Sequence, residues 1–201
     1  MMTLGAIRAY MDAHPFALVI LVLTAAFWLV GESRQGSGQR AEATEVDAGS
    51  KRLLVVTLRG GLLIAFVAPT VLPAATILDE RGYVFWVGIA LMWAGIGIRL
   101  WAFRTLGHYF TFTVMTSPNQ KIVTTGPYRL LRHPSYAGGT LAFAGFGLAV
   151  GNWVSLGAVV ALPLVGIVNR IKVEEAALLA AAGEPYRSFA TGRKRMVPFI
   201  W

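Results

Sequence analysis

Long apolar runs with almost no charge limit most strongly what this chain can fold into. The runs cover about residues 14–30, 53–78, 83–103, 134–150 and 153–168. A membrane-spanning helix needs roughly 20 mostly apolar residues. Only 14% of the residues are charged, whereas a soluble domain carries roughly 25%. We therefore predict an all-α, polytopic transmembrane helix bundle of about five spans.

The first two runs need separate consideration. A signal peptide is the competing interpretation of the first run, and we reject it because no small-residue cleavage site follows Gly31-Glu32 directly. The second run contains Arg59, Pro69 and Pro73, and proline is tolerated in membrane helices because neighbouring groups satisfy the freed carbonyls. Residues 31–52 between these runs are rich in Gly, Ser, Glu and Arg, which predicts a flexible aqueous loop.

The distribution of basic residues predicts the orientation in the membrane. With five spans, the first loop, the polar region 104–135 and the tail 169–201 lie on one side and hold most of the 18 Lys and Arg residues. Arg8 and Arg81 lie on the other side. The positive-inside rule then places the tail in the cytoplasm and the N-terminus outside. We assign the net charge of +8 to anionic lipid rather than nucleic acid, and expect a bacterial inner membrane.

The polar region ends in a motif, residues 126–139, that leads into the fourth run. Gly126-Pro127 favours a turn, and Pro134 suits the first turn of a helix. His133 then lies at the mouth of that helix, where free backbone N–H groups attract anions. Arg132 adds a planar cation that can bind a carboxylate in a bidentate manner. The alternative is a helix start with an arginine that extends to lipid headgroups.

A second polar group lies in the tail, which we expect to be an amphipathic helical segment. Lys172-Val173-Glu174-Glu175 precedes an apolar run that ends at Gly183. This pattern predicts a short helix with Gly183 as its C-terminal cap. Two acids in its first turn would suit the helix dipole, which is a sufficient structural reason for them. The sequence has no cysteine, no Rossmann or P-loop fingerprint and no metal-ligand spacing, so we expect no metal.

These motifs together resemble a known family. The stretches 120–129 and 132–138, followed by Glu174-Glu175, residues 183–186 and the ending 197–201, closely resemble isoprenylcysteine carboxyl methyltransferases. The related phospholipid N-methyltransferases are similar in the same region. The resemblance covers about residues 104–201 and implies a catalytic region there: a cofactor loop 104–135, a helical hairpin 134–168 and the C-terminal segment 169–201. Residues 1–103 would form the N-terminal spans.

The resemblance implies S-adenosylmethionine as the cofactor and a lipophilic acceptor that enters from the bilayer. That acceptor could be a prenylcysteine-type carboxylate, a phospholipid amine or a small thiol. An amine would need a base, for which His108 and His133 are the candidates. The implied catalytic residues are Arg132, His133 and Glu175. The implied cofactor-binding residues are Gln120, Ile122, Val123, Arg132, His133, Tyr136, Glu174 and Glu175.

Two departures from the family pattern stand out. Arg193 lies one residue later than the tail arginine of the family, which puts its contact in doubt. Gly95-Ile96-Gly97 lies too far from residues 106–110 for the glycine motif of the phospholipid enzymes, and helix packing explains it better. The alternatives are a membrane sterol or steroid reductase that uses NADPH, and a non-catalytic membrane protein of the same fold.

Overall fold

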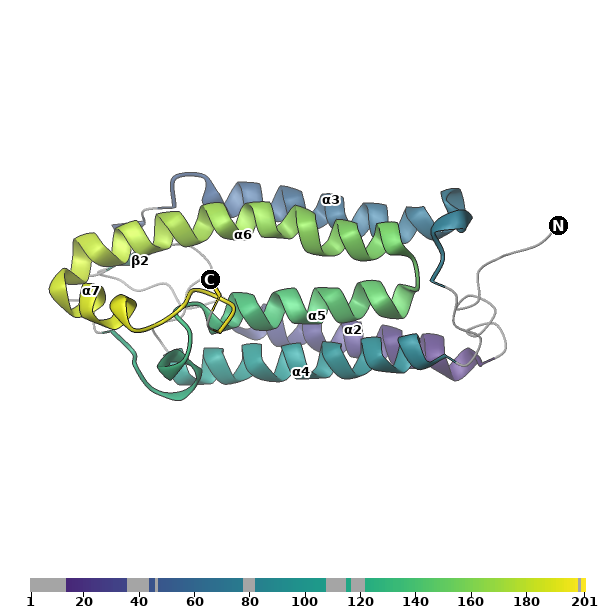
Figure 1. Ribbon diagram of the computed structural model, residues 1–201, viewed down its shortest axis with the longest axis horizontal. Helices are drawn as coiled ribbons and strands as arrows, with labels where there is room; N and C mark the ends of the chain where they lie inside the picture. The colour runs from purple at the N-terminus through teal and green to yellow at the C-terminus, as the bar shows by residue number, and fades with distance from the viewer. Residues whose placement is uncertain are drawn as a thin grey trace.

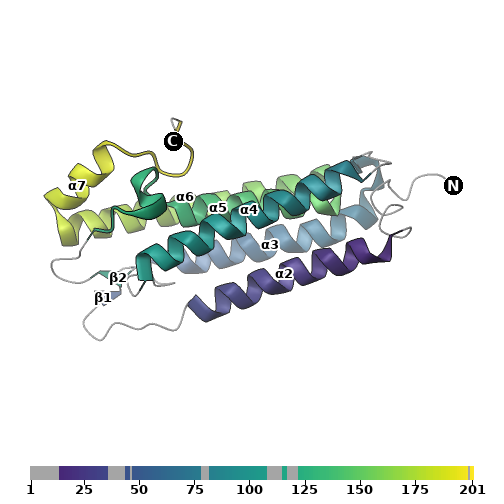
Figure 2. The ribbon, with the colours of Figure 1, turned by 90° about the horizontal axis from the view of Figure 1, so that it is seen from below.

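Five long helices run side by side in the computed structural model (Figures 1 and 2). The structure describes residues 14–35, 44–45, 47–77, 82–107, 115–116, 122–198 and 200–201. The long helices are α2 (Pro15–Gln35), α3 (Ser50–Val71), α4 (Tyr83–Leu106), α5 (Pro134–Val150) and α6 (Trp153–Ala182).

Shorter elements complete the bundle. A short helix, α7 (Glu184–Thr191), folds back at the end of α6 (Figure 1). Two 3₁₀ turns, η1 (Pro73–Ala75) and η3 (Gly126–Arg129), follow α3 and precede α5. The strands β1 (Thr44–Glu45) and β2 (Met115–Thr116) form an antiparallel pair of two residues each. Apart from this pair, the described regular structure is helical, which confirms the all-α part of the prediction.

The outside of the bundle is apolar. The helices α3, α4 and α6 are long and apolar enough to cross a membrane, and the apolar part of α2, Pro15–Gly31, is shorter. Leu29, Phe66 and Trp101 expose 68%, 67% and 51% of their surface. Many large apolar side chains are exposed on the helices, which is a liability in water but suits solvation by acyl chains in a bilayer. The chain is therefore an integral membrane protein.

Glycines bring α4 and α5 into direct backbone contact along what we call the α4–α5 seam. A Cβ atom at Gly95 would lie 2.4 Å from the backbone nitrogen of Ala142, and one at Gly145 would lie 2.5 Å from the carbonyl oxygen of Gly88. Small residues allow this close approach between membrane helices. Gly95 thus has the predicted packing role, whereas a Cβ atom at Gly97 would meet nothing within 4 Å.

The helices α3 and α6 form the other close pair. A Cβ atom at Gly61 would lie 2.8 Å from the carbonyl oxygen of Ala158. The buried hydroxyl of Ser155 donates a hydrogen bond to the carbonyl oxygen of Ala65 at 2.9 Å. A polar contact between helices has few competing partners in a membrane, so this bond fixes one end of the pair.

The hairpin between α5 and α6 follows from its local sequence. Pro134 is the first residue of α5, and His133 before it has a non-helical backbone, as predicted. Gly151 ends α5 in the left-handed conformation, at φ 74°. The side chain of Asn152 then accepts hydrogen bonds from two backbone N–H groups in the first turn of α6.

The prediction of a separate short helix from Lys172 to Gly183 is wrong. The helix α6 is continuous from Trp153 to Ala182, so it extends beyond the expected boundary at residue 168. Neither glycine nor proline interrupts residues 169–182, and Arg170, Glu174 and Glu175 bind partners inside the protein. Gly183, with φ 58°, ends α6 as predicted.

The predicted bounds of the flexible loop, residues 31 and 52, are both wrong. The helix α2 continues to Gln35, and α3 begins at Ser50. Asp47 and Ser50 are buried, because they contact a cation on α6 that is described below. Residues 36–43 lie outside the described part of the chain. At its other end α3 stops at Val71 rather than near residue 78, because Pro73 cannot continue the helical hydrogen bonding.

Candidate functional site

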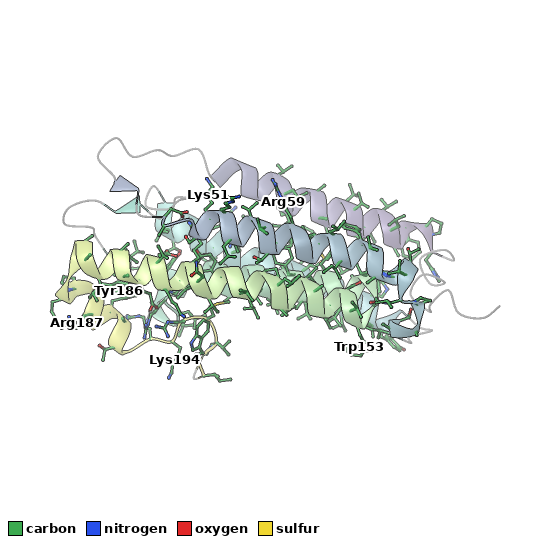
Figure 3. All side chains as sticks on the ribbon, turned by 90° about the horizontal axis from the view of Figure 1, so that it is seen from above. Lys51, Arg59, Trp153, Tyr186, Arg187 and Lys194 are labelled. Carbon is green, nitrogen blue, oxygen red and sulfur yellow. The ribbon has the colours of Figure 1, made fainter. Side chains whose placement is uncertain are left out.

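One end of the bundle brings together three segments that are distant in the sequence. They are the start of α5, the last turns of α6 and the chain after α7 (Figure 1). The backbone N–H of Arg132 donates to the carbonyl oxygen of Lys194 at 2.8 Å, and that of His133 donates to Arg195 at 2.9 Å. Figure 3 shows Lys194 at this end of the molecule and Trp153 at the opposite end.

Glu175 is the centre of an ion cluster at this end. Its carboxylate accepts hydrogen bonds from Arg132 Nη1 at 3.1 Å and from Arg195 Nη2 at 2.7 Å. Its Oε1 atom lies 3.2 Å from His133 Nε2. The Glu175 side chain is 14% exposed, and Arg132 also donates from Nε to the carbonyl oxygen of Arg193 at 2.8 Å. Both Glu175 oxygens are therefore already bound by cationic or imidazole groups.

Glu174 has a different environment from its neighbour. Its carboxylate accepts one hydrogen bond, from the Tyr136 hydroxyl at 3.0 Å, and lies 3.9 Å from His133 Nδ1. Its side chain is 32% exposed. Of the two carboxylates, Glu174 is thus the one with free acceptor capacity toward solvent.

A buried arginine connects this end of α6 to the segment before α3. Arg170 donates from Nε to the Tyr136 hydroxyl at 2.8 Å and from Nη1 to Asp47 Oδ1 at 2.9 Å. The side chains of Arg170 and Asp47 are 5% and 10% exposed. We call the following residues the polar cluster: Arg132, His133, Tyr136, Arg170, Glu174, Glu175 and Arg195.

An apolar cavity of about 530 Å³ adjoins the polar cluster. All five long helices contribute to its lining, with Trp28, Leu62 and Phe146 among the large side chains. The charged or hydroxyl-bearing groups in the lining are Arg99 and Tyr136. The guanidinium of Arg99 donates to the carbonyl oxygen of Ser135 at 2.8 Å. Tyr136 therefore belongs to both the cavity and the polar cluster.

Arg195 of the polar cluster and the neighbouring Tyr186 both have raised pKa values, which keep them protonated near neutral pH. Hydrogen bonding to Glu175 raises the pKa of Arg195, which stays a cation. Burial, followed by the negative charge of Glu175, raises the pKa of Tyr186 well above its ordinary value. Neither group can therefore act as a general base near neutral pH.

Five of the eight predicted cofactor-binding residues lie close together in the structure: Arg132, His133, Tyr136, Glu174 and Glu175. Ile122 and Val123 pack against the nearby cluster of aromatic residues that includes Tyr186. Gln120 and His108 lie outside the described residues. Among the residues that the structure describes, no group of three His, Cys, Asp or Glu side chains could hold a metal ion.

The helix-dipole explanation for the two acids is wrong. Glu174 and Glu175 lie toward the C-terminal end of α6, not in the first turn of a helix. A negative charge gains nothing from the dipole there. Their contacts with Arg132, Tyr136 and Arg195 explain their position instead.

Sequence reasoning missed Arg170, Arg195 and Asp47 as members or neighbours of this site. Arg170 precedes Glu174 by four residues on a helix, so the two share a face, and this spacing could have identified it. Arg195, rather than Arg193, is the tail arginine that binds Glu175. Arg193 instead donates to the carbonyl oxygen of Phe189 at 2.9 Å and lies over its ring.

Comparisons with known proteins point to a family of membrane methyltransferases. Residues 83–182 match the phospholipid methyltransferase family. A probable protein-S-isoprenylcysteine O-methyltransferase of Oryza sativa subsp. indica is 31% identical over 125 residues, which are 61% of this chain and 65% of that protein. Protein-S-isoprenylcysteine O-methyltransferase A of Arabidopsis thaliana is 32% identical over 125 residues, 61% of this chain and 64% of that protein. The chain thus spans less than two thirds of the length of these relatives.

A solved structure shares the fold. It is the eukaryotic intramembrane Ras methyltransferase, an isoprenylcysteine carboxyl methyltransferase, with a TM-score of 0.61 and 24% sequence identity. The match covers 73% of this chain and 52% of that one. This similarity shows that the matched part of the chain has the fold of a helical membrane protein.

Proposed function

We propose that this chain, which belongs to the family of isoprenylcysteine and phospholipid methyltransferases, transfers a methyl group from S-adenosylmethionine to a lipophilic acceptor. One observation carries the proposal. The hydroxyl of Tyr136 is bound to charged groups of the polar cluster, and the same residue lines the apolar cavity. A polar site with charges of both signs, joined to an apolar cavity in a membrane bundle, suits a charged donor and a lipid-soluble acceptor.

The polar cluster fits the charges of the cofactor. When bound, S-adenosylmethionine supplies an electrophilic methyl group on a sulfonium, and it also carries a carboxylate and an ammonium group. Arg132 and Arg195 supply cations for the carboxylate. Glu174 has the acceptor capacity for a cationic centre. Glu175, bound by Arg132, His133 and Arg195, holds these groups in place.

Two further features support a bound cofactor at this place. The Tyr186 hydroxyl is buried and has no hydrogen-bond partner among the described residues. A buried polar atom without a partner is costly, and a ligand group can satisfy it. Ile122 and Val123, beside Tyr186, give the cluster an apolar edge that suits the adenosine part. We retain Gln120 as a cofactor-binding residue on the resemblance alone.

The cavity favours an acceptor with an anionic or neutral reacting group. Arg99 is the cation in its lining, and none of its described lining residues is a carboxylate. Near Arg99 a protonated amine would be repelled, and a small thiol would leave most of the 530 Å³ unfilled. We therefore propose a prenylcysteine-type carboxylate on a lipophilic chain. The sequence resemblance limits the catalytic region to residues 104–201. In this proposal the acceptor site also includes Arg99 and parts of α2 and α3, so the catalytic region extends into the N-terminal spans.

Positioning and electrostatics carry the catalysis in this account. A carboxylate acceptor is already nucleophilic and needs no base, so the residues have only to align the oxygen with the methyl carbon. Arg99 binds the acceptor end, Arg132 and Glu174 bind the donor end, and Tyr136 lies between them. The apolar lining excludes water, which strengthens each of these charge interactions.

We also propose the five-span topology with an outside N-terminus and a cytoplasmic tail. The five helices lie side by side, and the polar cluster lies at the end of the bundle where Lys51, Arg187 and Lys194 are found (Figure 3). A reporter fused after Trp201 should be active only if it requires the cytoplasm. Activity of an export-dependent reporter at the same position would refute this topology.

Ligand-induced stabilisation of the purified protein in detergent tests the proposed function. S-adenosylhomocysteine should raise the melting temperature, and the rise should grow with the logarithm of its concentration once that concentration exceeds Kd. NADPH should not raise it. Stabilisation by NADPH and none by S-adenosylhomocysteine would favour a reductase, and stabilisation by neither would favour a non-catalytic membrane protein.

A further inference from the structure

We propose that Asp47, in the segment before α3, is a positioning residue of the cofactor site that acts on Glu174 through Arg170 and Tyr136. The inference rests on the proposed function, because it assumes that Glu174 binds a cationic part of the cofactor. Asp47 lies outside the region of the chain that matches the family. A positioning role for Asp47 would mean that the N-terminal part of the protein contributes to the cofactor site.

The contact between Asp47 and Arg170 is a buried ion pair between distant parts of the chain. Asp47 Oδ1 accepts a hydrogen bond from Arg170 Nη1 at 2.9 Å. Ser50, which is fully buried, donates to the same Asp47 oxygen at 3.0 Å and accepts from Arg170 Nη1 at 3.2 Å. Burial alone would raise the pKa of Asp47, but its hydrogen bonds and the Arg170 charge outweigh burial and lower it. The carboxylate is thus ionised and charge-matched.

Arg170 in turn sets the direction of the Tyr136 hydroxyl. The hydroxyl oxygen accepts a hydrogen bond from Arg170 Nε at 2.8 Å. A phenol has a single hydrogen to donate. With its oxygen occupied by Arg170, that hydrogen is directed at Glu174 Oε2, 3.0 Å away.

A negative charge at residue 47 keeps Arg170 away from Glu174. The side chains of Arg170 and Glu174 share one face of α6 and already meet through Tyr136. If residue 47 were neutral, the buried guanidinium would lose the negative charge that now lies 2.9 Å away, which is costly. It would then turn toward Glu174 and compete with the cofactor for that carboxylate. Asp47 therefore leaves Glu174 available to the ligand.

Asp47 also has a purely structural contact that an experiment must separate from this effect. Its Oδ2 atom accepts from the backbone N–H of Lys51 at 3.0 Å, in the first turn of α3. An asparagine can still accept this hydrogen bond through its amide oxygen, but it carries no charge. The substitution Asp47→Asn therefore removes the charge and keeps an acceptor for the helix start.

Calorimetry on the full chain in detergent tests the proposal, with S-adenosylmethionine and S-adenosylhomocysteine as probes. Asp47→Asn should weaken binding of S-adenosylmethionine roughly tenfold, a change of about 1.4 kcal/mol. It should weaken binding of S-adenosylhomocysteine less, because that molecule lacks the sulfonium. Ser155→Ala is the matched control, because it removes a buried contact between α3 and α6 that lies about 22 Å along the helix from Arg170. It should lower the melting temperature and leave both affinities unchanged.

A double variant keeps the test decisive if Asp47→Asn alone does not fold. Removing both charges of a buried pair is tolerated better than removing one. Asp47→Asn combined with Arg170→Gln should bind S-adenosylmethionine as Arg170→Gln alone does, because Asp47 acts through Arg170. A further loss of affinity in the double variant would overturn the proposal.

The failure of this proposal differs from the failure of the proposed function. If the unmodified chain binds neither probe, the proposed function is wrong and the positioning role falls with it. If the unmodified chain binds both and Asp47→Asn binds them equally well, Asp47 only stabilises the start of α3. Equal losses of affinity in Asp47→Asn and Ser155→Ala would likewise reduce the role of Asp47 to general stability.

Discussion

The α4–α5 seam and the polar cluster lie in one bundle but differ in the groups that make their contacts. In the seam, backbone meets backbone at Gly88 and Gly95, and no side chain or ligand fits between the helices. In the cluster, charged side chains bind one another at the edge of a cavity, and Glu174 and Arg195 stay about one third exposed. The seam is continuous with the cluster, because α5 carries Tyr136 at its start.

This difference separates a region that stabilises the fold from a region that is available to bind a ligand. A close-packed glycine contact fixes the position of α5 and hence of the groups at its first turn. Charged groups that are partly exposed retain donors and acceptors for a partner. Substitutions in the seam should therefore change stability first, and substitutions in the cluster should change binding or turnover with the fold retained.

The largest effect is expected in the seam itself. Gly95→Ala places a Cβ atom 2.4 Å from the backbone nitrogen of Ala142, so the two helices must separate. Overpacking of this kind costs about 1–3 kcal/mol or more. Gly97→Ala is the matched control on the same helix, because its Cβ atom meets nothing within 4 Å. Melting temperatures in detergent should fall for Gly95→Ala only, and equal values would contradict the close packing.

The second effect concerns turnover through Arg132. Its guanidinium binds the carbonyl oxygen of Arg193 and the carboxylate of Glu175 at the same time. Lysine keeps the charge but lacks the planar fork, so Arg132→Lys should lose turnover by roughly a hundredfold. Arg129→Lys, at an exposed position of η3, should stay near the native rate. The comparison is made at matched expression and melting temperature, and near-native turnover in both variants would mean that turnover does not need the planar fork of Arg132.

The third effect separates the two neighbouring carboxylates. Glu174→Gln should weaken S-adenosylmethionine binding roughly tenfold, with a smaller effect on S-adenosylhomocysteine. Glu175→Gln should instead lower the melting temperature, because Arg132 and Arg195 lose a shared carboxylate worth on the order of 1.5–3 kcal/mol per hydrogen bond. Calorimetry and thermal unfolding of both variants give the answer. Unchanged affinity in both variants would assign both acids to structure.

The smallest effect is a pH dependence of stability that comes from Asp47. The folded protein lowers the pKa of this carboxyl below its ordinary value of about 3.9. Its contribution is therefore complete above that value and is lost as the pH falls through the lower folded pKa. The melting temperature of Asp47→Asn should fall less steeply than that of the unmodified chain below about pH 4. Parallel curves would show that the ion pair does not stabilise the fold.

Local patterns in the sequence predicted much of the fold and part of the site. The apolar runs identified the five long helices, and Pro134 and Gly183 correctly marked helix ends. The motifs around Arg132 and Glu174 identified groups that the structure brings together. These features depend on residues close in the chain.

The features that the sequence did not predict depend on contacts between distant residues. Asp47 and Arg170 are 123 positions apart, and nothing in the Gly- and Ser-rich segment before Asp47 indicates a buried ion pair. The length of α6 was underestimated because charged residues after Asn169 were assigned to a separate segment, whereas Arg170 and Glu175 on this helix pair with oppositely charged groups from distant parts of the chain. The cavity was not predictable, because its walls come from all five helices.

A labelled-methyl transfer assay with membrane lipid extract tests the central claim most directly. The purified chain receives S-adenosylmethionine labelled in its methyl group, with Arg132→Lys as the negative control and Arg129→Lys as the positive one. We predict label in the lipid phase that mild base releases as methanol, because a methyl ester is hydrolysed under conditions that leave an N-methyl or S-methyl group intact. Label that resists mild base would contradict the carboxylate acceptor, and no transfer to any lipid fraction would contradict the proposed methyltransferase activity itself.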